Sequence, residues 1–292
     1  MAHVHTMEGG SWQGPFRQSQ QEEATREVED GGLVFFPQLG FELLPAERRF
    51  LAAESVSEKV KNVSFDARSM VLRGSTLQGD DAAALMRMLQ RYAQQSRALV
   101  LSLLPQYARS LEQARTSFRP VQASGRTSSW RKDDRRLHVD AFPSSPNQGM
   151  RLLRVFSNIH PDREDRVWRL GEPFEAVANR YLSTVHRPVP GFSRLLLTLG
   201  ITKSLRSEYD HIMLKIHDHM KADGEYQAKA PSMELRLPPG STWIVCTDCV
   251  SHAALSGQFM MEQTFQLPVS AMLDPSRSPL RLLERMVGRA LV

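Results

Sequence analysis

Residues 232–248 read SMELRLPPGSTWIVCTD and place two strand-like runs on either side of a Pro-Pro-Gly turn. The first run alternates apolar and charged side chains, which is typical of a strand with one buried face. The second run, WIVC, is continuously apolar and is typical of a buried strand. This stretch therefore predicts a strand, a tight turn and a second strand.

Outside this hairpin, the predicted secondary structure changes once along the chain, near residue 119, from mainly helices to strands with helices between them. Helical spacing dominates residues 81–104, whereas later helices, at 173–182, 191–200 and 209–223, lie between strands. Further strands are predicted at 32–38, 59–66, 149–159 and 257–269, and further helices at 45–52 and 278–291. The pattern predicts an α+β protein whose β part is a sandwich or a barrel.

The same pattern predicts four segments. Residues 1–30 are polar and glycine-rich and are expected to be mostly disordered, with a short helix at 20–28. Residues 31–118 are expected to form a mostly helical part that packs on the core. Residues 119–270 form the predicted β core with a helical insertion, and residues 271–292 a C-terminal helix.

Composition limits the function classes. The 292 residues are 41% hydrophobic. The net charge of +5 suits an anionic partner, namely nucleic acid, acidic lipid or an anionic sugar, about as well as it suits a surface that is simply well solvated. The chain has two cysteines, Cys246 and Cys249, which are too few for a disulfide framework. Their CxxC spacing fits a redox pair or half a zinc site, but WIVCTDC is typical of a buried strand rather than of the strand-to-helix turn of a redox site. Without an apolar run of membrane-spanning length or a signal-peptide core, we expect a cytoplasmic protein.

The stretch RRLHVDAFPSSPNQG, residues 135–149, contains a candidate metal site. His138 and Asp140 are two residues apart and would project from the same face of a strand. His252 follows the apolar strand among small neighbours that leave room beside a metal ion. Two histidines and one carboxylate suit a non-haem Fe(II) oxygenase, in which open positions accept a 2-oxo acid and O₂.

A 2-oxo dicarboxylic acid also needs a cation for its distal carboxylate. The stretch QFMMEQTFQ after His252 contains no Arg or Lys, so the cation must come from elsewhere. Arg154 is the first choice, on a strand face that it shares with Asn158. The alternatives are Arg151, Arg126 and Lys215.

Two rival functions rest on other residues. His217 and His219 could hold zinc for a hydrolase if they lay on a strand, but on the predicted helix they diverge by about 200°. A basic nucleic-acid-binding module lacks a recognisable motif and interleaved aromatic residues, so no nucleic-acid partner is expected.

Four stretches together resemble the Kdo hydroxylases, a family of Fe(II)- and 2-oxoglutarate-dependent dioxygenases. They are SSWRKDDRRLHVDAFPSSPNQGMRLLRVFSNIHP, RVWRLGEPFE, YDHIMLKIHDHMKADGEYQ and STWIVCTDCVSHAALSGQFMMEQTFQLPV. The resemblance implies a double-stranded β-helix, or cupin-like jelly roll, with flanking helices. It also implies Fe(II) bound by His138, Asp140 and His252, with 2-oxoglutarate and O₂ as cosubstrates.

The implied substrate is Kdo (3-deoxy-D-manno-oct-2-ulosonic acid) attached to lipid A, hydroxylated at carbon 3 to give Ko. Basic residues upstream of His138 match the sugar carboxylate and the lipid phosphates, or simply form a solvated loop; they are Arg126, Arg131, Lys132, Arg135 and Arg136. A dioxygenase of the same fold with another substrate remains the alternative.

The C-terminal helix suggests a membrane contact. Its arginines recur every four residues and form a basic stripe beside an apolar face; they are Arg277, Arg281, Arg285 and Arg289. Such a helix either lies on the inner face of the cytoplasmic membrane or packs on the core with its arginines in water.

Overall fold

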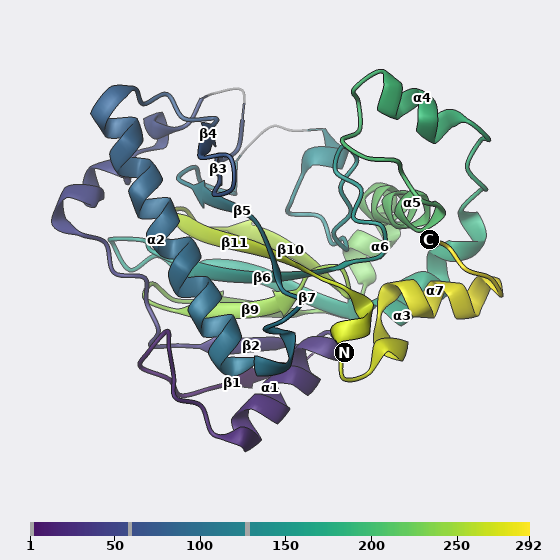
Figure 1. Cartoon of the computed structure of the whole chain (residues 1–292), viewed down its shortest axis with the longest axis horizontal. Helices are drawn as coiled ribbons and strands as arrows, with labels where there is room; N and C mark the ends of the chain where they lie inside the picture. The colour runs from purple at the N-terminus through teal and green to yellow at the C-terminus, as the bar shows by residue number, and fades with distance from the viewer. Residues whose placement is uncertain (1–2, 58–59, 126–128) are drawn as a thin grey trace.

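The structure, a computed structural model, describes residues 3–57, 60–125 and 129–292 (Figure 1). The strands are β1 Val4–Thr6, β2 Leu33–Phe36, β3 Val63–Asp66, β4 Val71–Arg73, β5 Glu112–Arg119, β6 Arg151–Asn158, β7 Arg166–Pro173, β8 Met233–Leu237, β9 Thr242–Cys246, β10 Val250–Ser256 and β11 Met260–Leu267. The helices are α1 Gln18–Glu29, α2 Gly79–Leu103, α3 Phe174–Tyr181, α4 Phe192–Thr198, α5 Glu208–Ala222, α6 Gly224–Lys229 and α7 Pro279–Val287.

The strands form two sheets that face each other. The larger sheet has the order β1-β2-β9-β6-β11-β5-β3-β4 and the smaller one the order β10-β7-β8. Aromatic rings fill the space between them: Phe156 of β6 stacks on Trp243 of β9 at 5.4 Å and meets Trp168 of β7 edge-on at 4.9 Å. This is a sandwich of mainly antiparallel strands, as the alternating sequence pattern predicts.

The outer face of the larger sheet is covered by helices, with α2 running across it (Figure 1). Residues of α2 at helical spacing, among them Leu85, Leu89 and Tyr92, share a core cluster with Phe118 of β5 and Met261 of β11. Burying each side chain of this size stabilises the fold by about 1.5–3 kcal/mol. Tyr92 also donates a hydrogen bond to the carbonyl oxygen of Val155, at 3.1 Å, which fixes α2 against β6.

The opposite face of the same strands is polar. Alternate residues of a strand point to one face, and on β5 and β11 these positions hold polar side chains: Gln113, Arg115, Ser117, Arg119, Glu262, Thr264 and Gln266. One end of the sandwich is therefore hydrophilic inside, and the functional site lies there.

The prediction that residues 1–30 are mostly disordered is wrong for the residues that the structure describes. Strand β1 pairs in parallel with β2, and α1, which overlaps the predicted short helix, buries Ala24 and Val28 completely. The charged run hides a narrow apolar stripe, which is sufficient to hold one face of a helix on the sheet.

The boundary predicted at residue 119 is also not seen. Strands β1 to β5 lie before or at that position and belong to the larger sheet, so the segment 31–118 is part of the core rather than a helical layer on it. Strand β5 escaped prediction because its polar alternate positions face the hydrophilic end of the sandwich. The helix predicted at 45–52 is a 3-10 helix, Pro45–Phe50.

Helix α7 packs on the body of the protein. Leu280, Leu282 and Leu283 are buried, while Arg285 lies 3.5 Å from Glu175 of α3 and Arg289 forms an ion pair with Glu208 of α5 at 2.5 Å. Of the two interpretations of the basic stripe, the structure supports the packed terminal helix. No helix within the described ranges combines the length and the apolar character needed to cross a bilayer.

The ion pair between Arg151 and Asp248 is completely buried at the turn that precedes β10, with Nε 2.8 Å from Oδ2. Asp248→Ala leaves the guanidinium buried without a counter-ion and should lower the free energy of unfolding by about 3–5 kcal/mol. Denaturant titration followed by circular dichroism measures the change.

Glu234→Ala is the control, because the pair of Glu234 with Arg236 is exposed and should be worth less than about 1 kcal/mol. Adding Arg151→Met to Asp248→Ala should restore part of the stability. An Asp248→Ala protein as stable as the wild type would contradict the prediction.

Candidate metal centre

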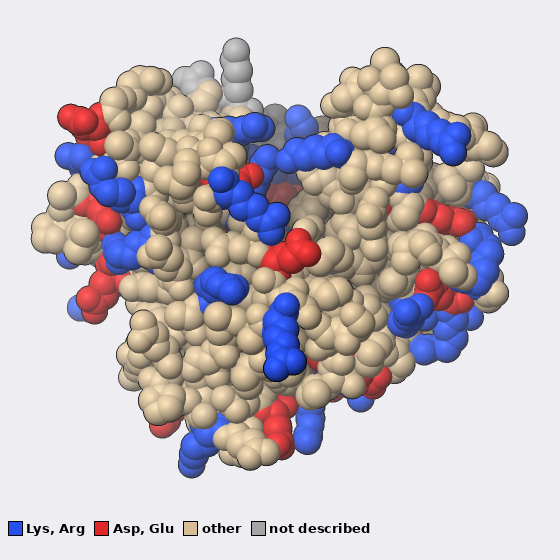
Figure 2. Space-filling model, in the orientation of Figure 1, with Lys and Arg blue, Asp and Glu red and all other residues tan. Residues whose placement is uncertain are grey.

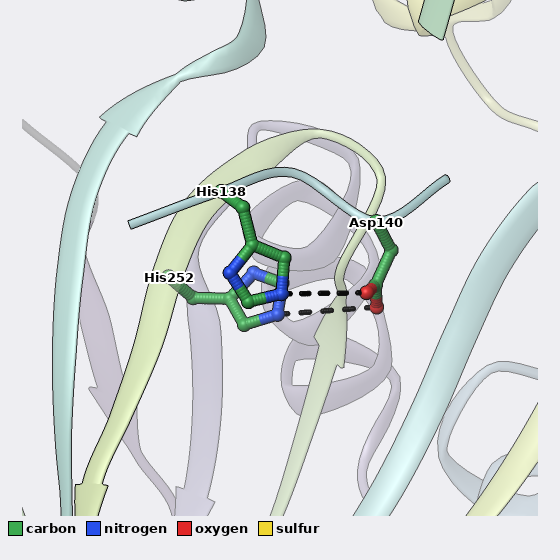
Figure 3. A group of neighbouring side chains, drawn as sticks. All are labelled: His138, Asp140 and His252. Carbon is green, nitrogen blue, oxygen red and sulfur yellow. Dashed lines mark ion pairs between the residues drawn. The ribbon is translucent and has the colours of Figure 1, made fainter. Parts of the chain in front are cut away.

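Three potential ligands from two distant segments meet at the hydrophilic end of the sandwich (Figure 3). His138 and His252 form a short antiparallel bridge, in which each backbone N–H donates to the other residue's carbonyl oxygen at 3.0 and 2.9 Å. Their rings lie 4.7 Å apart. The Asp140 N–H donates to the carbonyl oxygen of Thr247 at 2.9 Å, which holds the carboxylate beside both rings.

Hydrogen bonds fix the orientation of both imidazoles. The Nδ1 atoms of His138 and His252 lie 2.7 and 3.1 Å from the carbonyl oxygens of Arg136 and Val250. A carbonyl only accepts, so Nδ1 carries the proton and the Nε2 lone pair is free for a metal. The two Nε2 atoms face the Asp140 carboxylate at 3.7 and 3.9 Å (Figure 3).

The protonation states suit a metal ion. Burial lowers the pKa values of His138 and His252, so both are neutral. Burial alone would raise the pKa of Asp140, but the Arg154 guanidinium holds it below its usual value, so it is ionised. Its Oδ2 atom is buried and makes no hydrogen bond within the described chain. Two neutral imidazoles and an ionised carboxylate with one oxygen free of hydrogen bonds are a donor set that suits Fe(II).

Arg154 lies next to this set. Its Nη2 is 3.2 Å from Asp140 Oδ2, and its Nη1 is 3.3 Å from Glu262 Oε1. The guanidinium carbon lies 5.3 Å from the centre of the Phe142 ring, and Nε has no hydrogen-bond partner among the described residues. A buried guanidinium with donors to spare can bind a carboxylate beside the metal.

Arg119 is a second, half-buried cation, which the sequence did not reveal. Its Nε and Nη2 donate to Glu262 Oε2 at 3.0 and 2.7 Å. Strand register explains the meeting: Glu262 lies opposite Ser117 on β5 and Phe156 on β6. Arg119 and Arg154 are therefore its diagonal neighbours on the same face, within reach of long side chains.

A cavity of about 770 Å³ opens beside the metal centre. Arg154 and Glu262 form part of its wall, and Arg154 connects the cavity to the candidate ligand Asp140, which itself does not line it. Figure 2 shows Lys and Arg side chains along the hollow between the two raised lobes of the molecule. The charged lining residues are Asp66, Arg68, Arg73, Glu112, Arg115, Arg119, Arg154, Lys203 and Glu262.

Comparison with known proteins decides the family. Residues 11–290 match the family described as 3-deoxy-D-manno-oct-2-ulosonic acid (Kdo) hydroxylase. The chain belongs to the Kdo hydroxylase family. No curated protein matches the sequence.

Solved structures agree. A crystal structure of the Kdo hydroxylase KdoO, a non-haem Fe(II) α-ketoglutarate-dependent dioxygenase, in complex with α-ketoglutarate and Fe(III), is 48% identical, with a TM-score of 0.96 over 99% of this chain and 97% of that one. The cobalt(II) complex of KdoO is 49% identical over the same shares, with a TM-score of 0.97. The predicted family, jelly-roll fold and enzyme class are confirmed.

Within this Kdo hydroxylase, some predicted site residues lie elsewhere. Asn158 is four residues beyond Arg154, about 13 Å along the strand, and its amide donates to the carbonyl oxygens of Leu237 and Glu164 at 2.9 and 3.0 Å. It braces the far end of β6 and does not face the metal centre, so its predicted role in cosubstrate binding is not supported.

The alternative cations are also occupied or distant. Arg151 is paired with Asp248, and Lys215 is exposed on α5. Arg126 lies outside the described residues. Arg131, which was predicted to bind the substrate instead, lies 3.4 Å from Asp218.

The predicted basic cluster upstream of His138 does not line the cavity, as far as it is described. Arg136 donates to the carbonyl oxygen of Lys221 at 2.8 Å, Arg135 pairs with Asp133 at 2.8 Å, and Lys132 is exposed. The cations that do line the cavity come from four separate segments, which no local motif connects.

The rival zinc site is not assembled. Residues 208–222 form the predicted helix α5, on which His217 contacts Asp218 at 3.2 Å and His219 contacts Thr184 at 2.7 Å. Cys246, Asp248 and Cys249 are close enough to hold a metal, but contact with Cys246 and burial raise the pKa of the Cys249 thiol, and Arg151 already neutralises Asp248. The CxxC pair is a structural turn.

Removing a ligand should abolish metal binding. In a cobalt(II) titration followed by visible absorption, His138→Ala and His252→Ala should weaken binding by more than the roughly 10–100-fold that is typical of losing an outer-shell partner. His219→Ala is the control and should bind like the wild type. Unchanged binding in either ligand variant, or loss in the control, would refute the assignment.

Proposed function

We propose that this chain hydroxylates carbon 3 of Kdo in Kdo-lipid A to give Ko, using Fe(II), 2-oxoglutarate and O₂. One observation carries the proposal: the buried Arg154 lines a cavity that contains several cations, and its guanidinium lies 3.2 Å from Asp140 of the candidate ligand set. The membership of the Kdo hydroxylase family supports the choice of substrate. Because lipid A is a membrane lipid, we place the reaction at the inner face of the cytoplasmic membrane.

His138, Asp140 and His252 would hold the Fe(II). When bound, the metal allows O₂ to oxidise an unactivated C–H bond at the expense of 2-oxoglutarate, which becomes succinate and CO₂. The hydrogen bonds from Nδ1 to backbone carbonyls keep both imidazoles in the ligating tautomer. Trp168 stacks on His252 with ring centres 5.6 Å apart and shields that side of the site from water.

Arg154 would bind a carboxylate of 2-oxoglutarate. Its guanidinium is held by Glu262 on one side and by Asp140 on the other, so little side-chain freedom is lost on binding. Arg119 donates to the other carboxylate oxygen of Glu262, which keeps this side chain from rotating away from Arg154. The pair of strands β6 and β11 thereby fixes the cosubstrate relative to the metal ligands.

The sugar would occupy the cavity above Arg154. Its carboxylate and the lipid phosphates are anions, and the cavity wall offers them the cations Arg73, Arg115 and Lys203. Ser117, Ser144 and Thr264 line the same wall and offer hydrogen bonds to sugar hydroxyls. These contacts would present the methylene at carbon 3 to the metal side of the cavity.

Product analysis tests the activity. Kdo-lipid A incubated with the enzyme, Fe(II), 2-oxoglutarate and air should gain the mass of one oxygen atom, with one succinate formed per hydroxylated lipid. Tandem mass spectrometry should place the oxygen on the Kdo residue. Succinate formation without any change in the lipid would show that a dioxygenase of this fold acts on another substrate.

The two ends of the cavity should respond separately to substitution. Arg154→Ala should raise the apparent KM for 2-oxoglutarate by the equivalent of about 2–5 kcal/mol, as for a truncated buried charge pair, with a smaller effect on the sugar substrate. Arg115→Ala should instead raise the KM for Kdo-lipid A. Equal effects of both variants on both substrates would contradict these roles.

A further inference from the structure

Apolar side chains gather beside the cavity opening. Fourteen large apolar side chains are exposed in the described chain, and seven of these lie between residues 189 and 205, with 40–70% of each exposed. They are Val189, Phe192, Leu195, Leu197, Leu199, Ile201 and Leu205. Single exposed leucines are ordinary, but a concentration of this kind marks a contact surface.

Helix α4, at the centre of this stretch, is scarcely packed. Leu196 is its one buried residue, although a surface helix normally buries a whole stripe. The chain is fixed again just after α4, where Thr202 is buried and the Lys203 N–H donates to the carbonyl oxygen of Ser144 at 3.0 Å. The fold therefore holds α4 in place and leaves its apolar surface in solvent.

A second apolar edge lies across the opening. Met70 and Val71 at the β3–β4 hairpin are exposed, as is Val60, which also lines the cavity. The cavity wall includes residues from this hairpin and residues 203 and 204 from the α4 side. Figure 1 shows α4 and the hairpin as the two raised parts of the molecule on one side.

Unpaired cations lie between the two edges. Arg73, Arg115 and Lys203 line the cavity and form no ion pair with any residue that the structure describes. Partial burial lowers the pKa of Lys203, as do Arg115 and Arg73, whereas Asp66 acts in the opposite direction, so the three positive charges are close enough to repel one another. An anionic partner would relieve this repulsion.

We propose that α4, the β3–β4 hairpin and these three cations form a docking surface for an anionic lipid bilayer. The apolar side chains enter the head-group region and the cations meet lipid phosphates, as for other interfacial proteins. The inference rests on the proposed function in one respect: a lipid-linked substrate gives the surface its purpose. Docking would place the cavity opening against the membrane that contains the lipid-linked substrate.

A second copy of the chain fits this surface less well. A two-fold dimer would place the same patch on both partners, so the three unpaired cations would meet three others. Helix α7 fits a membrane less well too, because its leucines are buried and its arginines are already paired.

Vesicle cosedimentation tests the proposal with the full chain. Wild-type protein should bind vesicles of phosphatidylglycerol and phosphatidylcholine, less so at high salt. Leu195→Glu/Leu199→Glu should weaken binding by about ten-fold or more, because two apolar side chains are lost. Leu44→Glu/Leu273→Glu adds the same charge at two leucines that are equally exposed outside this surface, and should retain most of the binding.

A turnover assay distinguishes a failure of the docking surface from a failure of the proposed function. Leu195→Glu/Leu199→Glu should hydroxylate vesicle-embedded Kdo-lipid A more slowly, yet a short water-soluble Kdo oligosaccharide at the wild-type rate. If no Kdo substrate is hydroxylated, the proposed function fails while the vesicle result still stands. Equal loss of vesicle binding in both double variants, or a wild-type dimer that Leu195→Glu/Leu199→Glu dissociates without vesicles, would overturn the docking surface.

Discussion

Two backbone hydrogen bonds between His138 and His252 set the geometry on which the site depends. His138 lies in an irregular segment and His252 in strand β10, so no continuous ladder aligns them. The bridge fixes both backbones side by side, and the carbonyl partners of each Nδ1 then turn both Nε2 atoms toward Asp140. A ligand set built in this way is rigid before any metal arrives, which lowers the cost of binding.

Around the ligands, buried and half-buried charges alternate in sign. Lys61 contacts Asp134 at 2.9 Å, Arg119 lies between Asp134 and Glu262, and Arg154 lies between Glu262 and Asp140. Asp134 and Glu262 each lie between two cations, and Asp140 compensates the buried charge of Arg154. Arg166 shows the limit of this arrangement, because burial and the nearby Arg119 lower its pKa to about 9. The surplus of positive charge suits a dicarboxylate cosubstrate.

Much of the metal centre could be predicted from the sequence, and much of the cavity could not. His138 and Asp140 are adjacent in a local pattern, and His252 follows a recognisable buried strand. Arg119 and Arg115 were missed because β5 reads as a polar segment: its cavity-facing positions are polar, and this hides the alternation. The basic residues at 131–136 could not be assigned to a substrate site or to a solvated loop from the sequence, because local density of charge says nothing about which side chains other elements neutralise.

The N-terminal segment shows the opposite error. Its charged residues suggested disorder. A stripe of few apolar residues on α1 is nevertheless enough to order the helix, because the sheet offers an apolar face against which it packs. Composition averages over all faces of a helix, whereas packing depends on one.

The depth of Arg154 has a consequence for the order of events in turnover. This guanidinium lies at the inner end of the cavity, with 8% of its side chain exposed, whereas Arg73 and Lys203 are exposed at the outer end. Under the proposed assignment, a lipid-linked sugar that fills the cavity blocks the passage to Arg154. The dicarboxylate must then enter first and its product leave last, so the kinetic scheme is sequential and ordered, with succinate competing against 2-oxoglutarate.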